Sequence, residues 1–326
     1  MSFKHINPGY ASLSRDYNAY DIESYVYNPR LGRAFYSVGN GYGFRVGDRS
    51  SGRIGNLWIK FDVFLPETAY AEVSLSLPDG DIIKLRQVGT TATIVAFPYS
   101  EVLTLSGEQT NLKFNAVNTI WLHLTAADTY WSLTVMVNNV TVMEDVEDYT
   151  YDDGFISAGV MARLEIDEEL PVSNLIASDE EIDPKEIIVQ VECSDVETTM
   201  TVRDDGAYSS FTLGDYVLQT LDTTNLYNLF GADGTVTGMV AIAAPAYNTD
   251  KDTYLRLQCR KVDGETVTNY PMDSDADDEL SFMHELRRTE TGEDNPTPVI
   301  GEQIIVAANT TFASLNGVKL GWVLTE

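Results

Sequence analysis

Three carboxylates stand two residues apart in the middle of the chain, at Glu165, Asp167 and Glu169. Successive side chains of a β-strand point to opposite faces, so on a strand these three would share one face. A retaining glycosidase needs a nucleophile and an acid about 5 Å apart. Residues four apart on a regular strand are about 13 Å apart. The spacing therefore allows glycoside hydrolysis by Glu165 and Glu169 only if the two side chains lean together.

This row resembles the E-x-D-x-E catalytic strand of a laminarinase-like glycosidase family, which also uses a jelly roll. It departs from that family at Glu168, where an apolar residue would hold the strand in the core, and it runs directly into Pro171. The alternative interpretation is a solvated, acidic strand end in a strongly acidic chain. We favour that alternative and expect no enzyme activity and no catalytic residues.

Other reactive groups form no recognisable constellation. A nucleophilic triad needs a histidine beside a serine or cysteine, and the histidines are His5, His123 and His284. His123 stands between two leucines in a strand pattern, which favours a structural role. Residues 273–277 mimic the start of a calcium loop, but the turn glycine is missing and His284 occupies the twelfth position, where Glu is required. Residues 151–154 could also supply calcium oxygens, although such Asp-Gly turns are common. We expect no metal site and no cofactor.

Composition excludes several classes of protein. The 326 residues include 21 basic and 50 acidic side chains, a formal net charge of -29. Such a surface repels a phosphate backbone, so we expect no nucleic-acid partner. Two cysteines exclude a disulfide scaffold and a four-cysteine zinc site. No apolar run reaches the ~18 residues of a membrane-spanning helix, and the first residues contain no apolar stretch typical of a secretory signal.

Strict alternation of apolar and polar residues dominates the first half of the chain and predicts β-strands. Residues 71–77 alternate, turn at Pro78-Asp79-Gly80-Asp81 and continue into 82–85, as a hairpin does. Further strand-like runs lie at 57–65, 93–97, 101–105, 119–124, 131–137 and 140–143. Many short strands at regular spacing predict a β-sandwich or jelly roll.

The chain is predicted to hold two all-β domains. An apolar strand ends near residue 176, and the acidic stretch 177–186 has the composition of a linker. The remainder, 187–326, is predicted to form a C-terminal β-sandwich-like domain, with an acidic loop and a short helix within 272–296. Its strand-like runs are 187–191, 199–202, 216–220, 238–243, 254–258 and 318–324.

Residues 1–30 show little alternation and are rich in tyrosine, proline and asparagine. They are interpreted as an N-terminal arm. It either packs as an irregular lead-in along the first sandwich or extends to a neighbouring subunit, since tyrosine contributes large, amphipathic contact area at interfaces.

The strands at 121–124 and 131–139 resemble those of the laminin-G or concanavalin A-like jelly roll. Those domains place a Trp-His strand before a strand that ends in a Val-Asn-Gly turn. Here Asn139 replaces the glycine, and asparagine also tolerates a positive φ. Residues 155–159 and 172–176 resemble the closing strands. The resemblance covers residues 31–176 and implies a concanavalin A-like jelly-roll sandwich there, but little about activity.

Residues 173–182 and the second half resemble modules from structural proteins of tailed bacteriophages. The residues that carry this likeness include 206–208, 215–220 and 321–322. It implies a structural or adhesion component of a virion (tail, fibre or capsid decoration), made in the host cytoplasm. Its partners would be other virion proteins and copies of itself, most simply in a trimer, because virion appendages sit on symmetric sockets. The jelly roll would add contact with cell-surface glycans.

The densest basic stretch of this acidic chain consists of Arg30, Arg33, Arg45, Arg49 and Arg53. It predicts a contact for an acidic neighbouring subunit or a glycan, and scattered surface arginines are the alternative. Two other functions stay open: a polysaccharide-degrading enzyme that uses Glu165 and Glu169, and a non-viral surface-binding module with the same fold.

Overall fold

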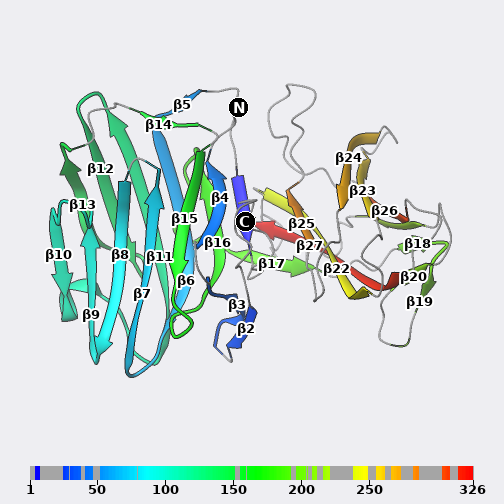
Figure 1. The fold of residues 1–326 in the computed structure, drawn as a ribbon, viewed down its shortest axis with the longest axis horizontal. Helices are drawn as coiled ribbons and strands as arrows, with labels where there is room; N and C mark the ends of the chain where they lie inside the picture. Colours follow the sequence, from blue (N-terminus) through cyan, green and yellow to red (C-terminus); the bar gives the residue numbers. More distant parts are fainter. Residues whose placement is uncertain are drawn as a thin grey trace. The chain divides into compact units, whose positions relative to one another are not determined.

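The chain forms two compact units, Met1–Glu186 and Ile187–Glu326. The computed structural model describes residues 4–7, 25–28, 30–37, 41–46, 52–78, 80–150, 155–158, 160–191, 196–202, 204, 208–210, 216–220, 238–248, 255–260, 266–272, 282–285, 303–308 and 315–325. All strand pairs in these residues are antiparallel, in both units (Figure 1). The predicted all-β fold class is confirmed.

The first unit is a sandwich of two large sheets. The eight-stranded sheet has the order β13 (Val140–Asp148), β12 (Tyr130–Val137), β11 (Ala116–Ala127), β6 (Asn56–Leu65), β16 (Val172–Ser178), β3 (Gly32–Phe35) and β2 (Tyr25–Asn28), with β1 (Lys4–Asn7) also paired to β16. The six-stranded sheet has the order β10 (Leu103–Ser106), β9 (Thr91–Ala96), β8 (Gly80–Gly89), β7 (Ala69–Leu77), β15 (Val160–Ile166) and β4 (Tyr42–Val46). Strands distant in sequence, such as β6 and β11, lie side by side because the chain crosses between the sheets, as in a jelly roll.

Alternation along the strands creates the core between the two sheets. Ile59 on β6 and its cross-strand partner Leu122 on β11 are buried, as are Trp131 on β12 and Leu75 on β7. Branched and aromatic side chains suit a pleated surface that is covered on one side. Residues between them in sequence point to the outer face, which on β6 and β11 carries aromatic side chains, Trp58 and Trp121, as well as polar ones such as Asp62.

The predicted hairpin at Asn138-Asn139 is confirmed in its backbone geometry. Val137 pairs with Val140, and the two asparagines between them have φ angles of 53° and 63°. A two-residue turn with positive φ at both positions matches the twist of the flanking strands. Asn139 therefore takes the conformation expected of the glycine that it replaces.

The first unit extends beyond the expected boundary at residue 176. β16 continues to Ser178, and the next residues, 179–186, which we call the strap, pack on the outer face of the eight-stranded sheet. The side chain of Ile182 is fully buried, and its carbonyl accepts a 2.8 Å hydrogen bond from Nε1 of Trp121. Nζ of Lys60 donates to the carbonyl of Glu186. The expected linker, 177–186, is thus part of the first unit, because its few apolar groups and its carbonyls find partners on that sheet.

The N-terminal residues also belong to this sheet where the structure describes them. Lys4–Asn7 pairs with β16, and Tyr25–Asn28 pairs with β3. These segments of the expected arm, 1–30, are therefore strands of the first unit.

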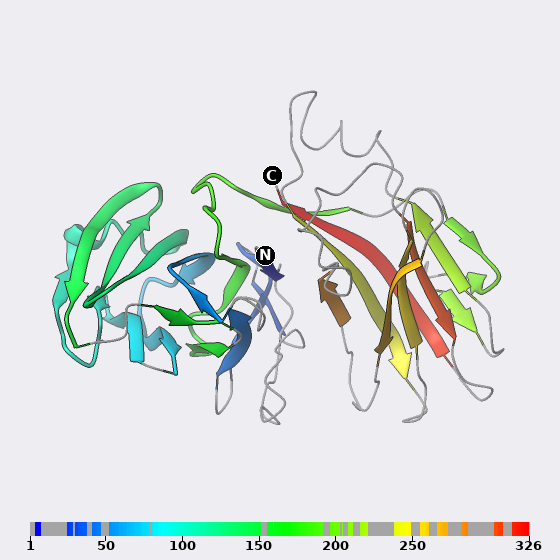
Figure 2. The same cartoon turned by 90° about the horizontal axis from the view of Figure 1, so that it is seen from above.

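The second unit contains two further sheets. The six-stranded sheet has the order β19 (Thr201–Val202), β20 (Tyr208–Ser210), β27 (Leu315–Thr325), β22 (Gly238–Asn248) and β25 (Phe282–Glu285), with β17 (Ile188–Val191) also paired to β27. The five-stranded sheet has the order β18 (Val196–Thr198), β21 (Tyr216–Thr220), β26 (Gln303–Ala308), β23 (Leu255–Arg260) and β24 (Thr266–Met272). Figure 2 shows these sheets from above. Residues 282–285, within the segment expected to include a helix, form a strand because they pair with the edge of β22.

Among the described residues, no helix has the length and apolar character needed to cross a membrane.

Candidate functional site

The carboxylates Glu165, Asp167 and Glu169 do not form one row on a strand. β15 ends at Ile166, and Asp167 begins a turn in which the N–H of Leu170 donates to the carbonyl of Asp167 at 2.9 Å. Glu165 stays on β15, with its side chain exposed. The shared face on which the glycosidase alternative depended is therefore not formed.

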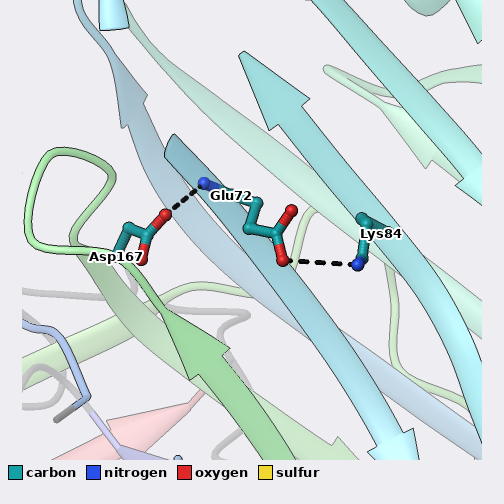
Figure 3. Close-up of polar contacts among 3 residues, drawn as sticks. All are labelled: Glu72, Lys84 and Asp167. Atoms are coloured by element: carbon teal, nitrogen blue, oxygen red, sulfur yellow. Dashed lines mark hydrogen bonds and ion pairs between the residues drawn. The ribbon is translucent and has the colours of Figure 1, made fainter. Parts of the chain in front are cut away.

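Asp167 and Glu169 instead hold the neighbouring strand β7. Oδ2 of Asp167 accepts a hydrogen bond from the N–H of Glu72 at 2.7 Å (Figure 3), and Oε2 of Glu169 accepts one from the N–H of Tyr70 at 3.0 Å. β15 pairs only with the later part of β7, and backbone N–H groups require acceptors. The two carboxylates continue the pairing where the backbone of β15 has turned away. On the other side, the carboxylate of Glu72 forms a 3.3 Å ion pair with Lys84 (Figure 3).

His123 is a packed ring on the outer face of β11. It stacks on the indole of Trp58, with ring centroids 4.4 Å apart and an interplanar angle of 4°. Its Nε2 lies 3.0 Å from Oδ1 of Asn56 and 3.1 Å from Oγ1 of Thr125. Burial lowers the pKa of His123, against nearby carboxylate charges that raise it. Its hydrogen-bond partners are the amide of Asn56 and the hydroxyl of Thr125, and neither is a serine or cysteine nucleophile.

The predicted basic stretch is divided among three sheets. Arg33 belongs to β3 in the eight-stranded sheet, Arg45 to β4 in the six-stranded sheet, and Arg53 to β5 (Arg53–Ile54), which pairs with β14 (Ile156–Ser157). Arg49 lies outside the described residues. The stretch is therefore not one patch on a single sheet, because consecutive strands of a jelly roll alternate between sheets.

The two calcium-loop candidates, 151–154 and 273–277, also lie outside the described residues. His284, at the twelfth position of the second loop, is on β25 opposite Ala241. In the part of the chain that the structure describes, no three His, Cys, Asp or Glu side chains are grouped closely enough to hold a metal ion.

Three tyrosines lie at one end of the jelly roll: Tyr99 on the turn after β9, Tyr130 at the start of β12, and Tyr149 directly after β13. Tyr99 is 84% exposed and Tyr149 is 62% exposed. The ring of Tyr149 lies against that of Tyr130, with centroids 5.2 Å apart and planes inclined by 43°. We call Tyr99, Tyr130 and Tyr149 the tyrosine rim. Figure 1 shows the edge strands that frame it, β10 of one sheet and β13 of the other.

One buried carboxylate fixes the two turns of the rim to each other. Oδ2 of Asp148 accepts a 2.6 Å hydrogen bond from Oγ of Ser100, and its Oδ1 accepts a 2.8 Å bond from the N–H of Thr150 and a second bond from the hydroxyl of Thr150. Burial raises the pKa of Asp148, but these hydrogen bonds together lower it by more than burial raises it. The pKa of Asp148 therefore lies below its ordinary value. We call these hydrogen bonds among Ser100, Asp148 and Thr150 the clamp. Tyr99 and Tyr149 are each one residue from a member of the clamp, so their backbones are held in place.

The turn that carries Tyr99 is held by its own backbone as well. Phe97 and Glu101 have φ angles of 47° and 46°, in the left-handed region that is uncommon for residues other than glycine. The N–H of Phe97 donates to the carbonyl of Ile82 at 2.9 Å, and the carbonyl of Phe97 accepts from both Ser100 and Glu101. Such backbone conformations persist only where the surroundings hold them. The backbone that carries Tyr99 is therefore held in one conformation.

The hydroxyl of Tyr149 is also engaged. It donates to Oε2 of Glu147 at 2.5 Å, and this hydrogen bond raises the pKa of Tyr149. The ring is therefore neutral and oriented, with more than half of its surface in water. Flat rings with neighbouring carboxylate oxygens can cover the apolar face of a sugar ring and accept hydrogen bonds from its hydroxyls.

The pattern of residue types along the chain does not single out the rim. Its tyrosines lie at positions 99, 130 and 149, far apart in sequence and at strand ends, where alternation gives no information. The available signal was that an aromatic residue recurs in or beside three turns, where polar residues are usual.

Comparison with known proteins found no matching family model and no matching curated protein. Among solved structures, an alginate lyase Aly36B mutant in complex with alginate tetrasaccharide has a TM-score of 0.29 and 11% identity, over 45% of this chain and 74% of that one. Domain 4 of AbnA, a GH43 extracellular arabinanase from Geobacillus stearothermophilus in complex with arabinotriose, has a TM-score of 0.28 and 14% identity, over 56% and 84%. Arcelin-5, a lectin-like defense protein from Phaseolus vulgaris, has a TM-score of 0.29 and 9% identity, over 54% and 97%. Likenesses with TM-scores this far below 0.5 carry no functional argument for this chain.

Proposed function

We propose that this protein is a non-catalytic binding protein whose jelly-roll unit binds saccharides at the tyrosine rim. The observation that carries the proposal is the pair of exposed rings, Tyr99 and Tyr149, on two turns whose backbones the clamp at Asp148 joins. A sugar ring that covers them removes apolar surface from water. Because the clamp has already ordered both turns, binding costs little further conformational entropy.

The acidic row supports a binding role over hydrolysis. Asp167 and Glu169 accept hydrogen bonds from the backbone of β7, so their carboxylates serve the fold. A glycosidase needs one carboxylate free to attack and another free to donate a proton. We therefore propose that Glu165 and Glu169 perform no hydrolysis.

The test is saccharide binding by the full chain and by Tyr99→Ala and Tyr149→Ala, on a microarray of neutral oligosaccharides followed by calorimetry. Aromatic residues at the centre of an interface commonly contribute more than 1 kcal/mol, so we expect each substitution to weaken binding about tenfold. The matched control is Tyr70→Ala. Tyr70 is also highly exposed, at 79%, but it lies about 20 Å along β7 from the rim.

Equal loss of affinity in Tyr70→Ala and Tyr99→Ala would contradict a site at the rim. No binding to any saccharide on the array would contradict the proposed function. Release of shorter oligosaccharides during incubation would contradict the non-catalytic role.

We further propose that this binding serves attachment of a virion of the tailed-phage type, with the chain in a homotrimer. The support is the resemblance of residues 173–182 and of the second half to phage structural modules. Portal, capsid or tail genes beside the coding gene, and a particle image that contains this chain, are the expected findings. Light scattering after size exclusion should give about three times the chain mass of 36.1 kDa. A monomer without such neighbouring genes would contradict the proposal and favour a non-viral surface-binding module.

A further inference from the structure

Carboxylates surround the tyrosine rim on each of its turns. Glu147 holds the hydroxyl of Tyr149, and Asp148 forms the clamp. Glu101 is exposed two residues after Tyr99, and Asp128 is exposed two residues before Tyr130. The rim therefore combines aromatic surface with concentrated negative charge, in a chain whose formal charge is -29.

The clamp carboxylate is ionised at neutral pH, because its hydrogen bonds hold the pKa of Asp148 below the ordinary value. The side chains of Glu101 and Asp128 are exposed to water. Arg53 lies on β5, with its guanidinium 3.7 Å from the centre of the Phe155 ring. β5 lies at the same end of the jelly roll as the rim, because the carbonyl of Gly55 accepts a 2.8 Å hydrogen bond from the N–H of Ala126. Arg53 therefore offsets part of the negative charge there, and the four carboxylates named above outnumber it.

We propose that the tyrosine rim discriminates by charge: it accepts neutral and amino-bearing saccharides and rejects uronates, sialylated and sulfated ones. This inference rests on the proposed saccharide site. The rings provide contact area to any pyranose, so they do not discriminate by charge. The surrounding carboxylates repel an anionic sugar and attract an ammonium group, and like charges placed at an interface suppress the wrong partners.

The dependence on salt distinguishes this mechanism from a shape-based one. Repulsion between exposed charges is screened beyond about 8 Å at physiological ionic strength and beyond about 3 Å at 1 M. The preference for neutral over acidic saccharides should therefore shrink as salt is added. A steric mismatch would not respond to salt.

The experiment uses three tetrasaccharides on one β-1,4-gluco backbone and three on an α-1,4-galacto backbone: the neutral, the 2-amino and the uronate form of each. Calorimetry or array binding at pH 6 is measured for the full chain at 20 mM and 500 mM NaCl. On whichever backbone binds, we expect the uronate to bind at least tenfold more weakly than the neutral form at low salt, and the amino form to bind more tightly. At high salt the difference should fall to about threefold or less.

The test variant is Glu101→Gln with Asp128→Asn, which removes two exposed charges outside the clamp. It should bind the uronate several-fold more tightly than the unmodified chain does and leave the neutral form unchanged. The control is Glu67→Gln with Glu108→Gln. These residues are also exposed, and they lie at the other end of the sandwich, in the β6–β7 turn and after β10. The control should leave the discrimination as it is.

Uronate binding equal to or tighter than neutral binding, while Tyr99→Ala still abolishes it, would overturn the charge discrimination and leave the saccharide site standing. A preference unaffected by salt and by the Glu101 and Asp128 substitutions would overturn it in the same way. Binding of none of the six probes, nor of any array saccharide, would overturn the proposed function itself.

Discussion

The packing of the strap is tested most directly by shortening Ile182. Its side chain is fully buried against the eight-stranded sheet, whereas Ile187, five residues later, is 51% exposed. Ile182→Ala removes about three methylene equivalents, worth about 0.8 kcal/mol each, or about 2.4 kcal/mol. The cavity that remains adds to this, since buried Ile→Ala changes cost about 2–5 kcal/mol. We therefore expect a loss of about 3 kcal/mol of unfolding free energy in the first unit.

The assay is urea unfolding of the full chain followed by tryptophan fluorescence. Of the four tryptophans in the chain, Trp58, Trp121 and Trp131 lie in the first unit, so the signal reports mainly on that unit. With a slope near 2 kcal/mol per molar urea, the expected loss lowers the midpoint by about 1.5 M. Ile187→Ala is the matched control, and an exposed substitution of this kind should stay within about 0.5 kcal/mol.

Equal midpoints for Ile182→Ala and Ile187→Ala would refute the reasoning. That result would mean that residues 179–186 are a solvated linker, as their composition alone suggests. A loss in Ile182→Ala that also appears as a lower fluorescence of Trp121 in the native state would support the strap, because Trp121 donates to the Ile182 carbonyl.

Two further predictions concern titratable groups. Burial lowers the pKa of His123, against the charges of Asp145 and Glu181, so the unfolded chain takes up a proton first as pH falls below about 6.5. The contribution of His123 therefore disfavours folding increasingly from pH 7 to pH 5, so over this range the unmodified chain should become less stable relative to His123→Gln. Identical pH profiles of the two urea midpoints would contradict this. Asp148→Ala leaves Ser100 and Thr150 without their acceptor and should cost about 1–3 kcal/mol, with weaker saccharide binding. Because the folded pKa of Asp148 is lowered, this stabilisation is present above about pH 4 and is lost as pH falls through the folded pKa. Unchanged thermal unfolding of Asp148→Ala at pH 7 would show that the clamp does not hold the turns.

The strands could be predicted because their signal is local. Residues 216–220 form β21 with the predicted bounds, and 71–77 lie within β7. The turn at Asn138-Asn139 followed from residue types that tolerate positive φ. The end of β15 was not predictable in this way, since alternation continues through Glu165, Asp167 and Glu169 while the backbone turns after Ile166. What decides that turn is the pair of N–H groups on β7 that the two later carboxylates satisfy.

The candidate site was not predictable from local pattern either. Ser100 and Asp148 are 48 residues apart, and only the meeting of the edge strands β10 and β13 brings them together. The strap is similar: an acidic, proline-ended stretch has the composition of a linker, and its attachment depends on Trp121 and Lys60, which are 61 and 126 positions away from their partners.

The amino-acid sequence by itself determined the all-β class, the positions of most strands, the hairpin turns and the strongly acidic surface. Side-chain alternation and turn residues determine the strands and hairpins, and both can be read from a few neighbouring residues. The acidic surface follows from the overall amino-acid composition. The tertiary structure alone decided which turns meet, where the first unit ends and what the acidic row does. Those outcomes depend on hydrogen bonds and burial between groups far apart in the chain, and such contacts exist only once the two sheets have packed.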